Sequence, residues 1–411
     1  MIATTTSDRI GSLPVGRSRL RSIPPTPTVP HKGGGSTDVF RFIAAVCLAL
    51  GTVSVVIGQA PSALPKIAAV DYDERGAFRV NAKPFFPIGL YDAPVDERTL
   101  RELRGFGFNV LVCDAKACAG LPAKGFYGMV HTDKKIDDLS GVFMGVGADS
   151  PALIFRKNLL KQVAEANAKT RSAVPGRPIM NAIGYWPDEP KGVVKGVLPS
   201  KALYEDLVAA IDVSGPYLYP IPYQPVSSVG DAVARARIAS GGKKPIIAIL
   251  QLFVWDAKDR YPTPAELRCM AFLALVEGSH GIGYYSYGSI NGRPKTNIAE
   301  VQPELWKSVR KLNHDIADIG PRLLAGAASS DLTLAKDTLA VKMKVVREQS
   351  ASLAVLVNSA ATSQAVKLMA QPGFRGQLTS HDGKRLTIKD GAATLMLEPF
   401  GVAIIHVNQP S

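Results

Sequence analysis

Between residues 76 and 320 the chain alternates between two kinds of hydrophobic pattern. Short runs rich in β-branched and aromatic residues predict strands, and the segments between them carry apolar residues at helical spacing. The strand-forming runs number eight and lie at 86–91, 108–113, 126–131, 141–146, 178–185, 213–219, 245–253 and 281–287. A short hairpin over 76–80 and 83–86 comes first and leads into the first run.

The intervening helices have recognisable starts and faces. Thr263 and Glu266 have the spacing of a capping box, with Pro264 at the first helical position. A later helix repeats apolar residues at i, i+4, i+7 and i+11, namely Leu305, Val309, Leu312 and Ile316. Strands that alternate with helices predict a parallel α/β sheet, and eight repeats predict a TIM (β/α)8 barrel over residues 70–324. A doubly wound open sheet is the alternative.

From residue 325 the helical spacing stops and strands follow one another. Predicted strands lie at 339–346, 353–358, 365–369, 377–380, 386–389, 393–397 and 402–407. Turn pairs such as Asp382-Gly383 and Asp390-Gly391 separate them. The pattern predicts a small all-β antiparallel sandwich domain over 325–411.

The first sixty residues have a different texture. Residues 1–41 are rich in Ser, Thr, Pro and Gly with six basic residues, residues 42–57 are apolar and uncharged, and Ala60 follows. This order is typical of an export signal, and an apolar run of sixteen is shorter than the roughly twenty residues of a spanning helix. We predict a leader over 1–60, cleaved near Ala60, and a periplasmic or extracellular protein. An uncleaved membrane tether through residues 42–57 and a buried core helix are the alternatives.

The distribution of charge and the absence of certain motifs argue against some classes of ligand. The net charge is +13, but the 48 Lys and Arg residues are scattered in singlets and doublets, which indicates a solvated basic surface rather than a nucleic-acid face. The sequence has no GxGxxG or Walker motif, and its six histidines never cluster at metal-ligand spacing. We therefore predict no nucleic-acid partner, no cofactor and no metal.

Four cysteines occur in the chain. Cys47 lies in the apolar run of the leader, and Cys269 lies in a helical pattern that predicts burial. Cys113 and Cys118 could pair, but so short a loop is expected to strain a disulfide.

A (β/α)8 barrel carries its reactive residues at the carboxyl ends of its strands. At these positions the chain is rich in aromatic residues and carboxylates: Tyr91, Asp92, Asp149, Tyr185, Trp186, Asp188, Glu189, Tyr217, Tyr219, Gln251, Trp255 and Tyr285. Aromatic faces stack on sugars, and glycoside cleavage generally uses two carboxyl groups. The residue types therefore fit a carbohydrate cleft, although packing and helix capping are alternative roles for each residue.

Several stretches resemble the clan A glycoside hydrolases, which join a (β/α)8 barrel to a β-sandwich. FRVNAKPFFPIGLYDAP at 78–94 is similar to their entry into strand one, and LRELRGFGFNVLV at 100–112 to their step into strand two. WPDEP at 186–190, DVSGPYLYPIP at 212–222 and segment 251–288 resemble later motifs, and 353–358 and 397–407 resemble the sandwich. The resemblance implies glycan cleavage, with an acid/base glutamate ending strand four and a nucleophilic glutamate ending strand seven.

Two positions depart from that pattern. Glu189 follows the fifth predicted strand, so either one strand is counted in excess or the family's D-E-P is the D-S-P at 149–151. Gln251 stands where the resemblance places the nucleophile, and an amide cannot ionise. Gln251 therefore argues against a standard two-glutamate retaining mechanism and leaves the choice between retaining and inverting open; an inverting arrangement needs no nucleophile on strand seven.

The sequence predicts an exported glycoside hydrolase-like protein acting on an oligo- or polysaccharide. Glu189 is the predicted general acid, and Asp149 or Asp188 is the second carboxylate. Tyr91, Asp92, Tyr185, Trp186, Tyr217, Tyr219, Gln251, Trp255 and Tyr285 are the predicted sugar-binding residues. The alternative, motivated by Gln251, is a non-catalytic glycan-binding or envelope polysaccharide-assembly protein on a degenerate barrel.

Overall fold

The computed structural model describes residues 63–147, 158–184, 201–256, 258–288, 297–335, 340–349, 351–372, 374 and 376–408. The chain divides into two compact units, residues 1–57 and 58–411, and the first lies outside the described residues. The predicted leader over 1–60, with its apolar run at 42–57, is therefore not described. None of the described helices combines the length and hydropathy needed to cross a membrane.

Within the described residues, eight parallel strands close into a barrel. They are β4 (Ile88–Leu90), β5 (Val110–Val112), β6 (Tyr127–Val130), β7 (Val142–Val146), β8 (Ile179–Gly184), β9 (Val213–Tyr217), β10 (Ile247–Gln251) and β11 (Gly281–Tyr285). Each lies inside one of the eight predicted runs. β11 pairs with both β10 and β4, so the sheet has no edge. The predicted barrel is confirmed, and the open-sheet alternative is excluded.

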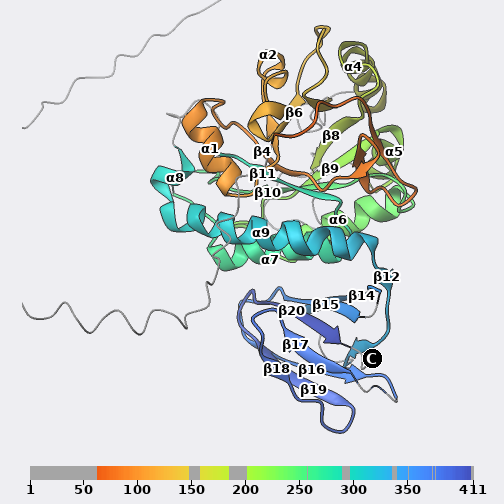
Figure 1. Cartoon of the computed structure of the whole chain (residues 1–411), viewed down its shortest axis with the longest axis vertical. Helices are drawn as coiled ribbons and strands as arrows, with labels where there is room; N and C mark the ends of the chain where they lie inside the picture. The colour runs from red at the N-terminus through yellow and green to blue at the C-terminus, as the bar shows by residue number, and fades with distance from the viewer. Residues whose placement is uncertain are drawn as a thin grey trace, which may run out of the picture. The chain divides into compact units, whose positions relative to one another are not determined.

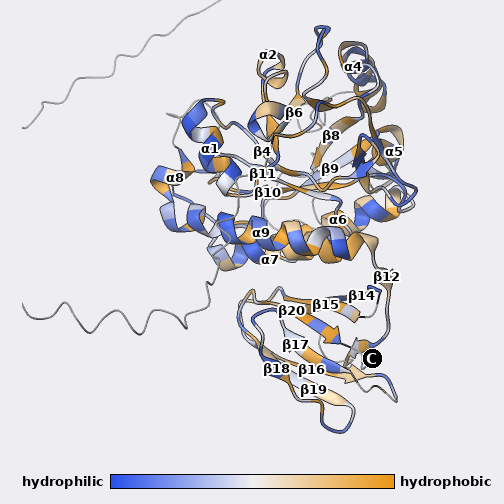
Figure 2. Cartoon of the chain, in the orientation of Figure 1, coloured by the Kyte–Doolittle hydropathy of each residue, from blue (hydrophilic) through white to orange (hydrophobic). Residues whose placement is uncertain are grey.

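Helices and short helical turns connect the strands and surround the barrel (Figure 1). The described helical segments are α1 (Glu97–Gly105), α2 (Ala115–Cys118), the 3-10 turn η1 (Pro122–Lys124), α4 (Leu159–Ala173), α5 (Lys201–Ala210), α6 (Ser228–Ala239), α7 (Pro264–Val276), α8 (Ile298–Val301) and α9 (Pro303–Ala325). Polar and apolar positions both run along α9 (Figure 2), and its predicted apolar repeat is buried.

The predicted capping box at the start of α7 is present. Thr263 Oγ1 accepts the Glu266 N–H at 3.2 Å, and the Glu266 carboxylate accepts the Thr263 N–H at 2.8 Å. Arg260 also donates to both oxygens of that carboxylate at 2.7 Å. These bonds hold the pKa of Glu266 below its usual value, although burial acts in the opposite direction and is the largest single influence.

The C-terminal region contains two antiparallel sheets. In the described residues the larger sheet has the order β12 (Ala327–Ala328), β14 (Val341–Arg347), β15 (Ala351–Asn358), β20 (Val402–Asn408), β17 (Gln377–Ser380) and β18 (Arg385–Leu386). The smaller sheet has the order β13 (Leu332–Leu334), β16 (Gln364–Ala370) and β19 (Ala392–Leu397). Both sheets contribute to one apolar core, as the predicted β-sandwich requires.

Strand β15 is buried along nearly its whole length because both faces of its sheet are covered. Ala354 and Leu356 face the core shared with the smaller sheet, whereas Leu353, Val355 and Val357 join the core around α7 and α9. The Cys269 thiol on α7 donates to the Asn358 carbonyl at 3.4 Å. The sandwich therefore packs directly against barrel helices. 

The amino-terminal end of the barrel, its base, is closed by β1 (Val70–Tyr72), β2 (Phe78–Val80) and β3 (Lys83–Pro84). The ring of Phe78 packs edge-on against Phe143 of β7, with centroids 5.2 Å apart. Arg177, only 6% exposed, donates to the carbonyls of Ile67, Ala68, Leu139 and Val142 at 2.8–3.3 Å. One guanidinium thus joins the closing segment to strands β7 and β8.

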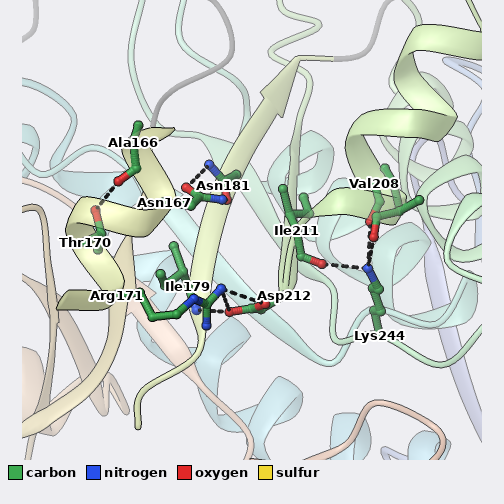
Figure 3. A network of polar contacts seen from close by, with 11 residues as sticks. Ala166, Asn167, Thr170, Arg171, Ile179, Asn181, Val208, Ile211, Asp212 and Lys244 are labelled. Atoms are coloured by element: carbon green, nitrogen blue, oxygen red, sulfur yellow. Dashed lines mark hydrogen bonds and ion pairs between the residues drawn. The ribbon is translucent and has the colours of Figure 1, made fainter. Parts of the chain in front are cut away.

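A second polar network lies at the base around β8 and β9 (Figure 3). Asp212 accepts the Ile179 N–H at 3.1 Å and forms an ion pair with Arg171 at 2.9 Å. The Lys244 ammonium lies at the carboxyl end of α5, where a cation is favourable. It donates to the carbonyls of Val208, Ala209 and Ile211. These charges have structural partners and stabilise the end of the barrel opposite the predicted cleft.

We predict that Arg177→Met lowers the free energy of unfolding by about 3 kcal/mol, because buried carbonyls lose their donor. Arg171→Met is the matched control, since its ion pair is more exposed and is worth at most about 1 kcal/mol. Urea unfolding of both variants provides the comparison. Equal stability of the two variants would show that Arg177 does not hold the base together.

Candidate functional site

Closure of the barrel brings four predicted residues to neighbouring strand ends. Tyr217 ends β9, Gln251 ends β10, Tyr285 ends β11 and Tyr91 follows β4, and these four strands are adjacent in the order β9, β10, β11, β4. Gln251 and Tyr285 are partners in register. The carboxyl end of the barrel, its rim, therefore gathers side chains that are widely separated in sequence.

Tyr219 lies at the centre of an aromatic cluster on this rim. Its ring stacks on Tyr217 and Tyr285, with centroids 5.2 and 5.8 Å away. Phe253 packs edge-on against it at 4.9 Å, and Trp255 lies tilted at 5.8 Å. Edge-on and stacked pairs are favourable arrangements for aromatic rings. We call these five residues the aromatic cluster.

The aromatic cluster is buried at its centre and open at its edge. Tyr219 is only 9% exposed, whereas Trp255 is 41% exposed. The Trp255 indole N–H donates to the Tyr219 carbonyl at 3.3 Å, and its ring also packs against Phe253 at 5.1 Å. Packing and a hydrogen bond thus fix an accessible tryptophan at the rim, where it offers a stacking surface to a ligand.

Tyr91 and Asp92 extend the rim on the far side of Tyr285. The Tyr91 ring lies edge-on to Tyr285 at 5.4 Å, and its carbonyl accepts the Tyr287 N–H at 2.9 Å. Asp92 is exposed and has a backbone φ of 60°. Both residues therefore lie at the first strand end, as predicted from the sequence.

Gln251 is 0% exposed and holds backbone in place. Its Oε1 accepts the Ile221 N–H at 2.9 Å, and its Nε2 donates to the Ile221 carbonyl at 2.8 Å and to the Phe253 carbonyl at 3.1 Å. Both amide hydrogens are used in these bonds. The side chain fixes the segments after β9 and β10, and the predicted contact with a sugar hydroxyl would require one bond to open.

The closed barrel settles the strand count on which the catalytic assignment depends. β7 is the fourth strand and β8 the fifth, so Asp149 follows strand four and Glu189 follows strand five. No strand was counted in excess. Asp149 thus stands in the sequence where the resemblance places a carboxylate after strand four, and its role stays a prediction.

Five predicted site residues lie outside the described residues. They are Asp149, Asp188 and Glu189, the predicted catalytic carboxylates, and Tyr185 and Trp186, the predicted sugar-binding aromatics. The strands that precede them in the sequence are described: β7 ends at Val146 and β8 ends at Gly184. Their roles remain predictions.

A pair of buried amides supports the fifth strand. Asn181 of β8 and Asn167 of α4 exchange two side-chain hydrogen bonds of 2.9 and 3.0 Å. Gly147 makes room for them, since a Cβ there would collide with both amides. The pair fixes helix α4 on β8.

Two aromatic residues that the sequence pattern did not single out also belong to the rim. Phe253 belongs to the aromatic cluster, and Tyr223, 66% exposed, donates its hydroxyl to Asp259 at 2.7 Å. Phe253 stands midway between Gln251 and Trp255, so alternation along the chain was a usable signal. For Tyr223 the only signal was an aromatic residue in the loop after a strand.

No group of three or more His, Cys, Asp and Glu side chains that could hold a metal ion occurs among the described residues. The described rim combines aromatic rings with tyrosine hydroxyls.

No protein-family profile matches the chain, and no curated protein sequence matches it. Solved structures do resemble it. A glycoside hydrolase family 5 protein from Bacteroides vulgatus has a TM-score of 0.53 at 13% identity, covering 84% of this chain and 95% of that chain. A family 27 β-L-arabinopyranosidase from Geobacillus stearothermophilus, in complex with arabinose, has a TM-score of 0.50 at 9% identity, covering 79% and 97%.

At such identities the likeness defines the fold. The chain has the (β/α)8 barrel and the C-terminal antiparallel sheets that the resemblance of the sequence motifs implied, and the resemblance is confirmed for the fold. Fold alone does not determine chemistry, so activity depends on the rim residues.

We predict that Gln251→Glu destabilises the protein by at least about 3 kcal/mol, because it removes two buried donors and adds a buried carboxylate. Gln364→Glu on β16 is the control, since its amide bonds only the Thr362 hydroxyl in an exposed setting; surface changes usually stay within about 0.5 kcal/mol. Urea unfolding measures both variants. A stable Gln251→Glu variant with increased glycan hydrolysis would contradict the backbone-holding role.

Proposed function

We propose that the protein is an exported glycoside hydrolase that cleaves an oligo- or polysaccharide with inverting stereochemistry. The aromatic cluster, with its exposed Trp255 at the carboxyl end of the barrel, is the observation that carries the proposal. The fold shared with glycoside hydrolases supports the same class of substrate. Export is proposed from the leader pattern of residues 1–60, with retention of 42–57 as a membrane tether as the alternative.

In the proposed reaction Glu189 protonates the leaving glycosidic oxygen, and Asp149 or Asp188 activates water on the opposite face of the sugar. Inverting enzymes hold two such carboxyl groups about 6.5–9.5 Å apart and need no nucleophile. Gln251 is compatible with this scheme because it stands at the end of strand seven without ionising. To act as an acid at neutral pH, Glu189 needs a raised pKa, and we propose that its sequence neighbours Tyr185 and Trp186 supply the apolar setting for it.

Substrate binding is assigned to the rim on either side of Tyr219. Trp255, Tyr217 and Tyr285 supply aromatic surface, and Tyr91 and Asp92 lie on the far side of Tyr285. A ring of sugar has an apolar face and hydroxyl edges, so it stacks on such surface while its hydroxyls bond to nearby polar groups.

We expect Glu189→Gln to abolish release of reducing ends from the substrate polysaccharide, because an amide cannot donate the required proton. Asp149→Asn and Asp188→Asn separate the second role: the variant of the true base loses at least about a hundredfold, in line with general base catalysis. Each is assayed over a panel of bacterial and plant polysaccharides. Melting temperatures close to that of the wild type exclude misfolding as the cause.

Undiminished release by Glu189→Gln would overturn the assignment of the acid. Release by the wild type that survives all three substitutions would place the chemistry elsewhere on the rim. Reducing ends released with retained anomeric configuration, followed by NMR, would contradict the inverting scheme.

A non-catalytic glycan-binding protein is the second candidate, and the buried, backbone-bonded Gln251 favours it. An envelope polysaccharide-assembly protein on a degenerate barrel would keep the aromatic rim and have no need for an ionisable group on strand seven. For this candidate we expect calorimetry to show binding of a glycan from the same panel, and we expect the wild-type protein to release no reducing ends.

In both candidates we expect Trp255→Ala to weaken glycan affinity at least about fivefold, the loss of roughly 1 kcal/mol typical of a truncated contact residue. Met396→Ala is the control, because Met396 is also an exposed apolar residue but lies on β19 of the sandwich. Calorimetric titration measures both. An unchanged affinity in Trp255→Ala would remove the aromatic cluster from the binding site.

A further inference from the structure

Two thiols meet beside the second barrel strand. Cys113 directly follows β5, and Cys118 is the last residue of α2. Their Sγ atoms are 3.0 Å apart. The short loop that was expected to strain a disulfide is a single helical turn, which begins after Asp114 and returns Cys118 to the end of the strand.

The surroundings leave room for both sulfur atoms. Gly128 of β6 faces them, and a Cβ at that position would collide with the Cys118 sulfur and lie 3.2 Å from the Cys113 sulfur. Cys118 is fully buried, whereas Cys113 retains some exposure. A reagent from solution can therefore reach Cys113 first, because Cys118 is buried.

We propose that Cys113 and Cys118 are a redox-active dithiol that closes to a disulfide when the protein meets a disulfide oxidant such as oxidised glutathione. A disulfide has an S–S length of about 2.05 Å, so closure requires the sulfur atoms to approach by only about 1 Å. The bond would fasten α2 to the end of β5, on the rim of the barrel. The proposal is independent of glycan cleavage.

The exchange proceeds in two balanced steps. The Cys113 thiolate attacks one sulfur of glutathione disulfide, forming a mixed disulfide and releasing one glutathione thiolate. The Cys118 thiolate then attacks the Cys113 sulfur and releases the second glutathione. The protein loses two protons and two electrons, and the oxidant gains them as two glutathione thiols.

The hydrogen bond with Cys118 raises the pKa of the Cys113 thiol, and burial raises it further. The reacting species is the thiolate, whose population is therefore small at neutral pH and grows as the pH rises. Closure is accordingly slow at neutral pH and faster in alkaline buffer.

Trypsin provides a direct test on the full-length protein. Lys116 lies between the two cysteines, so cleavage there yields peptides 105–116 and 117–124, which only a disulfide can hold together. We expect this linked pair after incubation with oxidised glutathione, denaturation and alkylation, and expect it to disappear after treatment with dithiothreitol. Its rate of formation should increase with pH.

Three variants complete the experiment. Cys269→Ser should form the linked pair like the wild type, because Cys269 is buried on α7 and takes no part. Cys118→Ser should retain glutathione on Cys113, because the resolving thiol is absent, and Cys113→Ser should form neither product. The proposal is overturned if oxidised wild-type protein gives two separately alkylated peptides, retains glutathione on Cys113, or links either cysteine to another residue.

Discussion

The pairing of β11 with β4 is the constraint on which the rest of the structure depends. It joins Ile282 to Ile88 across almost two hundred residues of chain and converts a row of parallel strands into a ring. A parallel ring has two unlike ends, because every strand begins at one and finishes at the other. Tyr91 can touch Tyr285 only because that pairing exists.

The two ends then acquire different chemistry. At the base, the charged groups bond to structural partners. Arg177 donates to four backbone carbonyls, and Lys244 donates to carbonyls at the end of a helix. Asp212 accepts a backbone N–H and pairs with an arginine. At the rim, aromatic rings support one another and leave Trp255 accessible. The Gln251 amide combines a structural polar contact with the aromatic rim, because it is a buried polar group that fixes the loops bearing the rings. The base thus holds the polar contacts that stabilise the barrel, and the rim holds the surface that we propose for binding.

Most of the architecture could be read from local patterns. All eight barrel strands were predictable because short runs of β-branched, aromatic and other apolar residues bounded by turn residues are a strong signal. Helix α7 was predictable because its capping box lies within four residues. Helix α6 was harder, since its many small residues give only a weak amphipathic pattern. The two-residue strand β12 is too short for any periodicity.

The site was less predictable because its contacts are distant in sequence. Chain position places Gln251 at a strand end, yet its role depends on Ile221, thirty residues upstream. The cysteine spacing left a pairing of Cys113 and Cys118 open but predicted strain, and it did not predict the helical turn that folds Cys118 back toward Cys113. Residue type and strand order thus identify which residues lie on the rim. Their tertiary hydrogen bonds, which the sequence does not reveal, determine which side chains are held in structural contacts.

The position of residue 64 has a practical consequence for handling the protein. Leu64 donates its N–H to Pro122, and Pro65 accepts the Tyr127 hydroxyl, so the described chain begins at the base of the barrel. A linker attached just ahead of these residues would immobilise the molecule by that end. A bead or sensor chip loaded in this way would leave the rim with the aromatic cluster facing the solution, where long polymer chains in the flowing sample can reach it.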